Sequence, residues 1–584
     1  MQKLKSLLAL SCLCTAVLGC NSTSNQKTFN FAPYNNYGQQ QTASSSNNVC
    51  HRPSDSSDIT VTTRNLKLTK NQNKGCFGSD NKFCDIRIYQ IMVESFRHSS
   101  NGAIGYATSW GPSNHNGNIR GIIDSLNYIK STGVNAIWLT PVFKTTRLED
   151  QDYIYDRLDG TGYFTSDYFE VDPKFGNKKE LKELIDKAHS LGLYVFFDGV
   201  LGHSKVNVNP ISPKGNKLKI QRRCRDWDGR IDKMSLVNGT CFDNEASMPF
   251  LKEFVSYWIE EFKIDGWRFD QAYQLSPEQW KEIRLTIEAA SANKKSSYLF
   301  KGKKVQPLGF NVAEYWSDNP AMIDRNGFKG NGVTSVMNFP LRDELVSVLA
   351  TRDEPKKPRC AQEASNLDAV NKKSQDYSGS GIAVSFLGNH DLPRFGDLLQ
   401  RTGNTSKSGK DQEMFNAHKE ALSFIAAQTG PMIIYYGEET ADELAGFDNK
   451  VDSGCSDKMV CEDHVSRTTG HVDNLTKDEK ELKDYVSQIL NLRDKHLSLS
   501  HGNRVHIYSD ATVYMDLKTY KNDKVIYALN NSSDSRNVAI KADALAQLGL
   551  QNCTLSNALT KESVSFDKIV LPAVSGTFLN VECK

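Results

Sequence analysis

The feature that most constrains the fold is an alternation, between residues 85 and 440, of short apolar runs with helical patterns. Such alternation is typical of parallel strands joined by crossover helices. Each run is apolar through its middle, as expected of strands that are covered on both faces. The eight candidate strands are Arg87 to Phe96, Val134 to Leu139, Leu193 to Val200, Gly266 to Asp270, Gly309 to Glu314, Thr334 to Phe339, Val384 to Asn389 and Met432 to Tyr436. Eight such units predict an α/β fold with a closed (β/α)8 barrel of the TIM type.

The segments between these runs have the features of helices. The segment from Lys178 to Leu191 carries five apolar residues near the helical period, on one face: Leu181, Leu184, Ile185, Ala188 and Leu191. The run Ser276-Pro277-Glu278-Gln279 has an N-cap, a first-turn proline and a capping-box glutamine. We therefore expect a helix to begin there, just after the fourth strand.

The barrel domain is predicted to occupy residues 49–500, including a short N-terminal extension. Residues 203–247, roughly, lack an obvious helix and are expected to form a loop-rich subdomain over the barrel mouth. Residues 351–381 form a second, polar insertion. After Leu499 the pattern changes to short alternating runs separated by Asn, Ser and Asp turns, which predicts a C-terminal β-sandwich over residues 501–584.

The first residues have the layout of an export signal. Lys3 and Lys5 precede an apolar run, Leu7 to Leu18, that is too short to cross a bilayer and stay. The run leads to Cys20 in a pattern that resembles a bacterial lipobox, so residues 1–20 are expected to be a lipoprotein signal peptide with Cys20 lipidated. An ordinary signal peptide is the alternative. Residues 21–48, rich in Ser, Asn, Gln and Thr, predict a flexible tether, and hence a lipid-anchored protein of the bacterial cell envelope, periplasmic or surface-facing.

Three of the 13 cysteines lie in or at the end of this leader, which leaves 13 − 3 = 10 in the rest of the chain. An even number in an exported protein suggests disulfides, although the sequence does not fix their pairing. The pairs that short separations suggest are Cys76 with Cys84, Cys224 with Cys241, and Cys455 with Cys461. A zinc site is the alternative, but the cysteines and histidines lack ligand spacing.

The formal net charge of +2 does not indicate the strongly basic surface that nucleic-acid binders generally need. We expect no nucleic-acid partner, and membrane contact only through the lipid anchor. A neutral or modestly charged ligand suits this composition better.

Charged residues close several of the apolar runs. In a (β/α)8 barrel the active site lies at the carboxyl ends of the strands, so these residues are the candidates for chemistry. The third strand ends in Asp198-Gly199-Val200-Leu201-Gly202-His203, the fourth in Arg268-Phe269-Asp270, the fifth in Glu314-Tyr315-Trp316 and the seventh in Gly388-Asn389-His390-Asp391. One such carboxylate could be an ordinary ion-pair partner, but four at equivalent heights favour a site.

These segments, in this order, resemble the ordered motifs of the α-amylase family of glycoside hydrolases. The run Met248-Pro249-Phe250-Leu251 is similar to a segment of the neopullulanase and cyclomaltodextrinase relatives in that family. The resemblance covers roughly residues 85–500. It implies a retaining hydrolase of α-glucosidic bonds in starch-derived α-glucans or maltooligosaccharides, with Asp270 as nucleophile, Glu314 as general acid/base and Asp391 as the carboxylate that binds sugar hydroxyls. Two carboxyl groups about 5 to 5.5 Å apart are what a retaining glycosidase needs.

The resemblance also implies a set of supporting residues. Arg268 lies two residues before Asp270 on the same strand, so it should keep Asp270 ionised. The substrate-binding group is expected to comprise Tyr163, Asp198, His203, Arg268, His390 and Arg394. Arg394 could orient Asp391 or form an ion pair elsewhere. Tyr315 and Trp316 could raise the pKa of Glu314 or simply pack.

Two departures from the family pattern bear on function. Calcium-dependent members place an Asn ligand where this chain has Gly202, which has no side-chain oxygen, so the usual calcium site is in doubt and any metal is left unspecified. No cofactor is required for the chemistry. After Asp270 the chain reads Gln271-Ala272-Tyr273-Gln274, without the Lys-His pair of typical polymer-cleaving α-amylases.

Two alternatives stay open. The covalent intermediate could pass to another sugar, which would make a transglycosylase, or α-1,6 bonds or cyclodextrins could be the target. In another class, the barrel could be an inactive, glycan-binding surface lipoprotein, since a fold does not imply a function. The retention of Asp270 and Glu314 favours an enzyme. The sequence does not specify the linkage, the product length or the oligomeric state.

Overall fold

The protein is seen in a computed structural model, whose described residues all belong to one compact unit, Gln39–Lys584. The residues that the structure describes are 50–68, 72–99, 116–145, 161–204, 208–221, 240–352, 360, 362–406, 409–447, 450–452, 460–461 and 465–584. The predicted leader, tether and Cys20 lie outside these ranges. Within them, every helix is too short or too polar to cross a bilayer.

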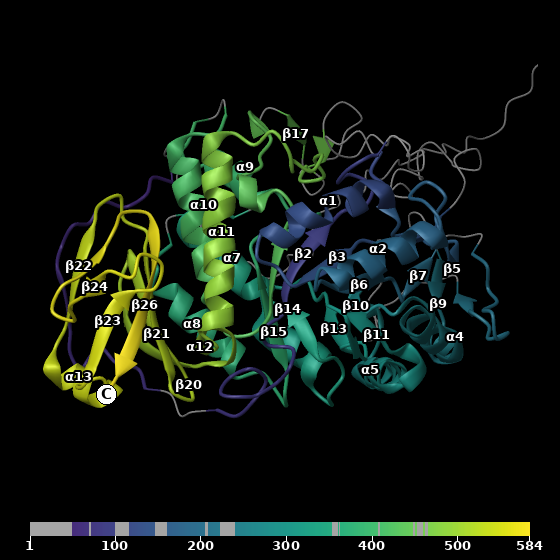
Figure 1. Cartoon of the computed structure of the whole chain (residues 1–584), viewed down its shortest axis with the longest axis horizontal. Coiled ribbons are helices and arrows are strands. Elements are labelled where there is room, and N and C mark those ends of the chain that lie inside the picture. Colours follow the sequence, from purple (N-terminus) through teal and green to yellow (C-terminus); the bar gives the residue numbers. More distant parts are fainter. Residues whose placement is uncertain are drawn as a thin grey trace, which may run out of the picture. The chain divides into compact units, whose positions relative to one another are not determined.

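Eight parallel strands close into a barrel, in the order β10-β13-β14-β15-β16-β2-β3-β6 (Figure 1). The barrel strands are β2 (Arg87–Ile91), β3 (Ala136–Leu139), β6 (Tyr194–Gly199), β10 (Gly266–Phe269), β13 (Phe310–Ala313), β14 (Ser335–Met337), β15 (Ile382–Phe386) and β16 (Met432–Tyr435). Each of the eight predicted runs contributes one strand, so the predicted barrel is confirmed. The first and seventh predicted runs extend beyond their strands, because residues 92–96 turn and residues 387–389 leave the sheet.

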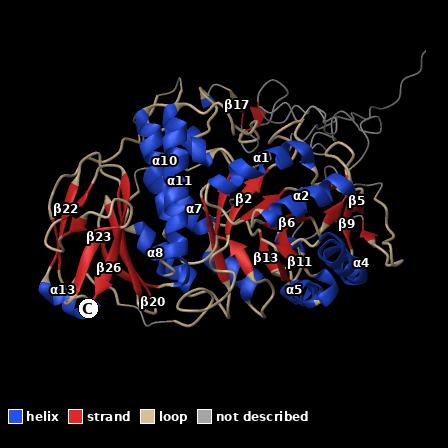
Figure 2. Cartoon of the chain, in the orientation of Figure 1, coloured by secondary structure: helices blue, strands red, loops and turns tan. Residues whose placement is uncertain are grey.

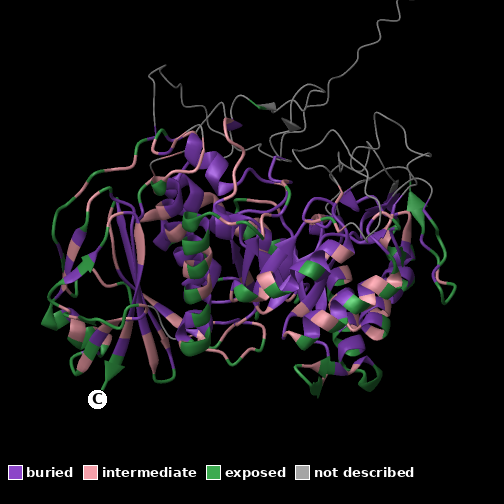
Figure 3. Ribbon diagram, turned by 45° about the horizontal axis from the view of Figure 1, so that its top comes forward, coloured by how far each residue is buried: buried purple, intermediate pink, exposed green. Residues whose placement is uncertain are grey.

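Helices follow the barrel strands along the chain and stand around them in Figure 1. The helices associated with the barrel are α1 (Ile119–Ser131), α2 (Lys178–Ser190), α4 (Asn244–Tyr257), α5 (Pro277–Ala292), α6 (Pro320–Ile323), α7 (Phe339–Leu349), α8 (Asn366–Gln375), α9 (Phe395–Gln400), α10 (Gln412–Ala426), α11 (Lys477–Lys495) and α12 (Ser498–His501). Their apolar faces bury one continuous core against the outside of the barrel. A smaller core fills its interior, and almost every residue of the barrel strands is buried (Figure 3).

Local sequence explains where the two predicted helices begin. In α2, Asn177 accepts hydrogen bonds from the backbone N–H groups of Lys179 and Glu180, and the predicted apolar face is buried. In α5, the Ser276 hydroxyl accepts from the backbone of Gln279, whose side chain accepts in return from the backbone N–H of Ser276. Both predicted helix starts are confirmed.

The two predicted insertions contain regular structure. Short strands β7 (His203–Ser204), β8 (Ile220–Gln221) and β9 (Thr240–Phe242) form a three-stranded sheet after β6. Helix α4 begins at Asn244, inside the range expected to be loop, because Asp243 caps it by accepting from the N–H of Ala246. The polar insertion after α7 contains α8, whose residue Asp368 is ion-paired with Arg504 of the C-terminal domain.

The C-terminal domain is built from two sheets, which agrees with the predicted sandwich (Figure 2). The larger sheet has the order β19-β20-β21-β26-β23-β24, with strands Asn503–Ser509, Val513–Tyr520, Asp523–Asn530, Ser575–Cys583, Cys553–Asn557 and Ser563–Val564. The smaller sheet, β1-β22-β25, combines Ile59–Val61, Arg536–Ile540 and Ile569–Leu571. Strand β1 precedes the barrel in the sequence, yet it pairs in parallel with β22, with Ile59 opposite Val538. The N-terminal extension therefore completes the C-terminal domain.

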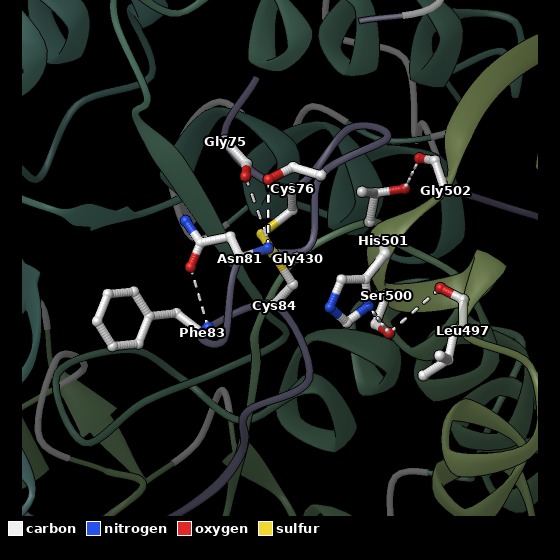
Figure 4. Close-up of a disulfide and its surroundings, with 12 residues drawn as sticks. Gly75, Cys76, Asn81, Phe83, Cys84, Gly430, Leu497, Ser500, His501 and Gly502 are labelled. Atoms are coloured by element: carbon white, nitrogen blue, oxygen red, sulfur yellow. Dashed lines mark hydrogen bonds between the residues drawn. A yellow bond between two sulfur atoms is a disulfide. The ribbon is translucent and has the colours of Figure 1, made fainter. Parts of the chain in front are cut away.

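Disulfides tie distant parts of this unit together. The predicted pair Cys76–Cys84 is present and closes a tight loop beneath the barrel, where Gly430 donates its N–H to the Ser500 carbonyl, 2.9 Å away (Figure 4). Two further disulfides, Cys50–Cys360 and Cys553–Cys583, were not suggested by short separations. The suggested pairs Cys224 with Cys241 and Cys455 with Cys461 include residues outside the described ranges.

Strand β1 yields a stability prediction. Ile59 is 3% exposed and packs in the core of the C-terminal domain, whereas its neighbour Thr60 faces solvent. Ile59→Ala should lower the free energy of unfolding of that domain by about 2–5 kcal/mol, because it removes buried methyl groups and leaves a cavity. Chemical denaturation followed by tryptophan and tyrosine fluorescence would measure this. Thr60→Ala is the control, and equal effects of the two substitutions would contradict the packing role of β1.

Candidate active site

Strand register brings three carboxylates and one arginine to the same end of the barrel. Arg268 on β10 lies opposite Asp198 on β6, and Phe269 lies opposite Ala313 on β13. Asp270 and Glu314 each follow the last residue of their strand, so they stand at the same level on neighbouring strands. Their backbone N–H groups continue the ladder, to the Gly199 carbonyl at 3.1 Å and the Phe269 carbonyl at 2.9 Å.

Arg268 lies at the centre of this cluster and is fully buried. Its Nη1 is 2.9 Å from Asp198 Oδ1 and 3.0 Å from Asp270 Oδ1, and its Nη2 is 2.6 Å from Glu314 Oε1. One guanidinium group therefore contacts all three carboxylates. Arg268 and Asp198 have no exposed side-chain surface, so, although they were predicted as substrate-binding residues, they lie beneath the site and support it.

Asp391 is held from the other side of the barrel mouth. Arg467 donates from Nη2 to Asp391 Oδ1 at 2.8 Å and from Nε to the His390 carbonyl at 3.0 Å. His390 Nε2 lies 3.2 Å from Asp391 Oδ2. The side chain of Asp391 is 20% exposed, against 8% for Asp270 and 4% for Glu314. Asp391 is thus the carboxylate most open to a ligand.

Aromatic side chains connect these two groups of charges. The Tyr163 ring stacks on His390 at a centroid distance of 5.2 Å, and its hydroxyl donates to Asp198 Oδ2 at 2.8 Å. Trp138 donates from Nε1 to the same oxygen, 3.1 Å away, and its ring lies 5.0 Å from the Arg268 guanidinium carbon. Gln90 Nε2 lies 2.8 Å from His390 Nδ1. Tyr163 and His390 are therefore parts of the same buried cluster as Asp198.

His203 follows β6, the third barrel strand. Next to it, the side chain of Gln274 fills the space that a calcium-binding side chain at position 202 would occupy. A Cβ at Gly202 would overlap the side-chain amide of Gln274. His203 Nδ1 lies 3.2 Å from Gln274 Oε1. Position 202 thus has no side-chain oxygen, and any side chain there would have to displace Gln274. No group of three or more metal-ligating side chains occurs among the described residues. The family's usual calcium site does not fit these residues.

Arg394 lies away from the three carboxylates. It donates to the carbonyls of Tyr436 at 2.7 Å and Ser466 at 3.0 Å, and its Nε lies 3.2 Å from Asp442 Oδ2. Of the two roles predicted for it, the geometry favours an ion pair elsewhere over the orientation of Asp391. Arg467, which does contact Asp391, was not identified from the sequence.

Burial raises the pKa of every carboxyl group around Arg268. The pKa of Asp198 rises to about 6, that of Asp270 to about 7 and that of Glu314 to about 8, because removal from water disfavours the charged form. Arg268 lowers each pKa, but by less than burial raises it. The expectation that Arg268 alone would keep Asp270 readily ionised therefore needs correction. Glu314 does hold a proton near neutral pH, as expected.

The two aromatic residues after Glu314 pack instead of enclosing its carboxyl group. The Tyr315 hydroxyl donates to the Asn326 carbonyl at 3.0 Å, and Trp316 stacks on Phe339 with ring centroids 5.5 Å apart. The backbone N–H of Gln271 lies 3.3 Å from Glu314 Oε2 and favours the charged form. Burial by the surrounding barrel is thus the main cause of the raised pKa.

Sequence reasoning missed four residues of this cluster: Gln90, Trp138, Gln274 and Arg467. Gln90 had a detectable signal, since an amide in the middle of a fully buried strand requires a hydrogen-bonding partner. Trp138 also lies within a predicted strand, but an aromatic residue in a buried strand is normally interpreted as part of the hydrophobic core. Arg467 follows Asp391 by 76 residues and lies outside any regular element, so no local pattern could identify it.

Comparisons with known proteins agree with this geometry. The family model described as the catalytic domain of alpha amylase matches residues 90–240 and 237–552. The cyclomaltodextrinase of Thermoanaerobacter pseudethanolicus is 26% identical over 478 residues, 77% of this chain and 70% of its own length. The maltogenic alpha-amylase of Bacillus acidopullulyticus is 26% identical over 489 residues, 79% of this chain and 71% of its own. The solved structure of AmyP with maltose is 41% identical, with a TM-score of 0.77, and the match covers 85% of this chain and 97% of that one.

The shared arginine yields a second prediction. Arg268→Met would leave three buried carboxylates without their cation, so the free energy of unfolding should fall by about 3–5 kcal/mol near pH 8. The folded pKa values would rise further above the unfolded ones, so the folded state would bind more protons and the deficit should shrink as the pH falls to 5. Thermal unfolding of wild type and variant across this pH range would measure the difference.

Arg120→Met serves as the matched control. Arg120 pairs with Glu183 and Glu180 at the surface, where solvent screens the charges, so its loss should destabilise the protein far less and depend little on pH. If Arg268→Met were no more destabilising than Arg120→Met at pH 8, the central role of Arg268 would be wrong.

Proposed function

The chain belongs to the α-amylase family of glycoside hydrolases, and from that premise we propose that it hydrolyses α-glucosidic bonds in maltooligosaccharides and related starch-derived glucans with retention of configuration. The observation that carries this proposal is the placement of Asp270 and Glu314 at one level on adjacent strands, both in contact with Arg268. Retaining hydrolysis needs two carboxyl groups on opposite sides of one bond, about 5 to 5.5 Å apart.

In the first step, Asp270 attacks the anomeric carbon as the glycosidic C–O bond breaks. Glu314 gives its proton to the leaving oxygen, for which its raised pKa suits it. In the second step, the Glu314 carboxylate takes a proton from water as that water attacks the anomeric carbon and releases Asp270. Two inversions at the same carbon restore the α configuration.

The other residues bind and orient. Asp391, fixed by Arg467 and His390, is placed to accept hydrogen bonds from sugar hydroxyls beside the reacting carbon. Tyr163 stacks on the buried His390 next to it and keeps more exposed surface than His390, 9% against 1%. Asp198 and Arg268 act from below, because neither is exposed to a ligand.

Relatives named cyclomaltodextrinase, maltogenic alpha-amylase and neopullulanase support a substrate range that includes cyclodextrins and pullulan as well as linear maltooligosaccharides. The sequence Gln271-Ala272-Tyr273-Gln274 after the proposed nucleophile supports the same range, since it lacks the Lys-His pair of typical polymer-cleaving enzymes. Transfer of the glucosyl group to a second sugar is the competing outcome.

The products of cleavage test this function. Wild-type protein should release sugars of initially α configuration from maltooligosaccharides, detected by proton NMR before mutarotation, and chromatography of digests of starch, pullulan, cyclodextrins and isomaltooligosaccharides should rank the substrates. Asp270→Asn should lose activity by several orders of magnitude, because no covalent intermediate can form.

Asp186→Asn, on the exposed face of α2, is the matched control and should keep wild-type activity. Products of initially β configuration would contradict retention. If the wild type bound glucan without cleaving any bond, the barrel would be a binding protein and the proposal would fail. Products longer than the substrate, without a net gain in reducing ends, would indicate transglycosylation.

The raised pKa values predict the pH dependence. Asp270 must be deprotonated to attack, so activity should rise as the pH passes its pKa of about 7. Glu314 must be protonated, so activity should fall as the pH passes its pKa of about 8. The negative charge of Asp198 raises the pKa of Asp270, and its removal in Asp198→Asn should therefore move the acid limb of the kcat/KM profile to lower pH. An acid limb that stays in place, in a variant that is still folded by circular dichroism, would refute this assignment.

A further inference from the structure

Gly202 and Gln274 form a close contact between the loops that follow β6 and β10. A Cβ at position 202 would overlap the Oε1, Cδ and Cβ atoms of Gln274. The φ angle of Gly202 lies outside the left-handed region, so glycine is required there for space and not for backbone conformation. The side chain of Gln274 thus fills the volume that any side chain at position 202 would need.

The orientation of the Gln274 amide is fixed by its two partners. Its Nε2 donates to Gln271 Oε1 at 3.1 Å, so its Oε1 faces His203 Nδ1, 3.2 Å away. An amide oxygen can only accept, so in this orientation the hydrogen bond calls for a proton on His203 Nδ1. Because Gln274 is 4% exposed, water competes little for these hydrogen bonds. Gln274 therefore selects one tautomer of His203.

Gln274 is also linked by hydrogen bonds, through Gln271, to Glu314, the proposed general acid/base. Gln271 adopts a left-handed backbone conformation, with φ 41° and ψ 54°, directly after Asp270. Such a conformation is strained for a residue with a side chain and persists only where its surroundings hold it. In it, the Gln271 N–H points at Glu314 Oε2, 3.3 Å away. The Gln274 side chain and backbone both bond Gln271, the backbone N–H donating to the Gln271 carbonyl at 3.1 Å.

We propose that Gln274 is a positioning residue for the reaction, which holds His203 in its Nδ1–H tautomer and holds Gln271 in the strained conformation that directs an N–H at Glu314. This inference rests on the proposed function. Gln274 has no contact with the reacting atoms. The small size of Gly202 leaves room for Gln274 to hold His203 and Gln271 in place.

A double-mutant cycle separates positioning from packing. Gly202→Ala should displace Gln274, so stability and kcat/KM should both fall. Gln274→Ala should lower kcat/KM by on the order of tenfold to a hundredfold, since small misplacements of catalytic groups have effects of that size. The double variant Gly202→Ala/Gln274→Gly, compared with Gln274→Gly alone, also removes the Gln274 Cβ, which would lie 2.5 Å from the new methyl group. The methyl group then has room, so the thermal stability lost in Gly202→Ala should return while kcat/KM stays low.

The pH profile gives a second readout that packing alone would not move. The Gln271 N–H favours the charged form of Glu314 and lowers its pKa. If that N–H turns away in Gln274→Ala and in the double variant, the alkaline limb should shift to higher pH. Gln306→Ala, an exposed glutamine far from Gly202 in the sequence, is the control and should change neither the limb nor kcat/KM.

Histidine nitrogen NMR tests the tautomer without any activity. With nitrogen-15 labelled histidine, His203, assigned by the signal missing in His203→Gln, should show protonated Nδ1 in the wild type and altered shifts in Gln274→Ala. A wild-type His203 protonated only at Nε2, or a double variant that regains full kcat/KM along with stability, would overturn the inference. A wild type that cleaves no glucan would instead refute the proposed function, and the NMR result would stand apart from it.

Discussion

The site depends on one buried cation shared by three carboxylates. Arg268 has no exposed surface, and Asp198, Asp270 and Glu314 are placed around its guanidinium group by the register of β6, β10 and β13. Without that cation, three buried negative charges would repel one another and bind protons. With it, burial still raises the pKa of Asp270 and of Glu314, so Glu314 can hold the proton that a general acid needs. In the proposed mechanism, acid and nucleophile are two carboxyl groups of nearly the same chemistry.

This arrangement explains why the positions of Arg268, Asp270 and Glu314 could be predicted from the sequence. Strands of a parallel barrel are continuous apolar runs, and residues two apart on a strand face the same way, so Arg268 and Asp270 could be placed together from spacing alone. Asp270 and Glu314 end runs that the sequence defines within a residue or two. The three carboxylates also occur in recognisable motifs, which tied each of them to a strand end.

The sequence did not place the surrounding residues in the same way. Arg467 reaches Asp391 from a segment without periodicity, and Gln274 meets His203 across two loops. Arg394 lies only three residues from Asp391, yet it contacts Asp442 and backbone carbonyls instead. A buried guanidinium group has five N–H donors, and each needs a hydrogen-bond acceptor. The left-handed Gln271 has no sequence signature, since glutamine carries no preference for that conformation. Strand β1 was missed for a related reason, because its partner lies in another domain.

That pairing of β1 with β22 bears on the order in which the molecule is made. Ile59 lies opposite Val538, so 538 − 59 = 479 residues separate the two partners. At synthesis rates of about 5–20 residues per second, roughly 25 to 95 s pass between the emergence of one strand and that of the other. The apolar face of β1 therefore stays without its partner strand until the whole barrel and β22 have been synthesised. The C-terminal domain therefore holds the beginning of the described fold in place, so the described unit becomes fully native only once β22 has been synthesised.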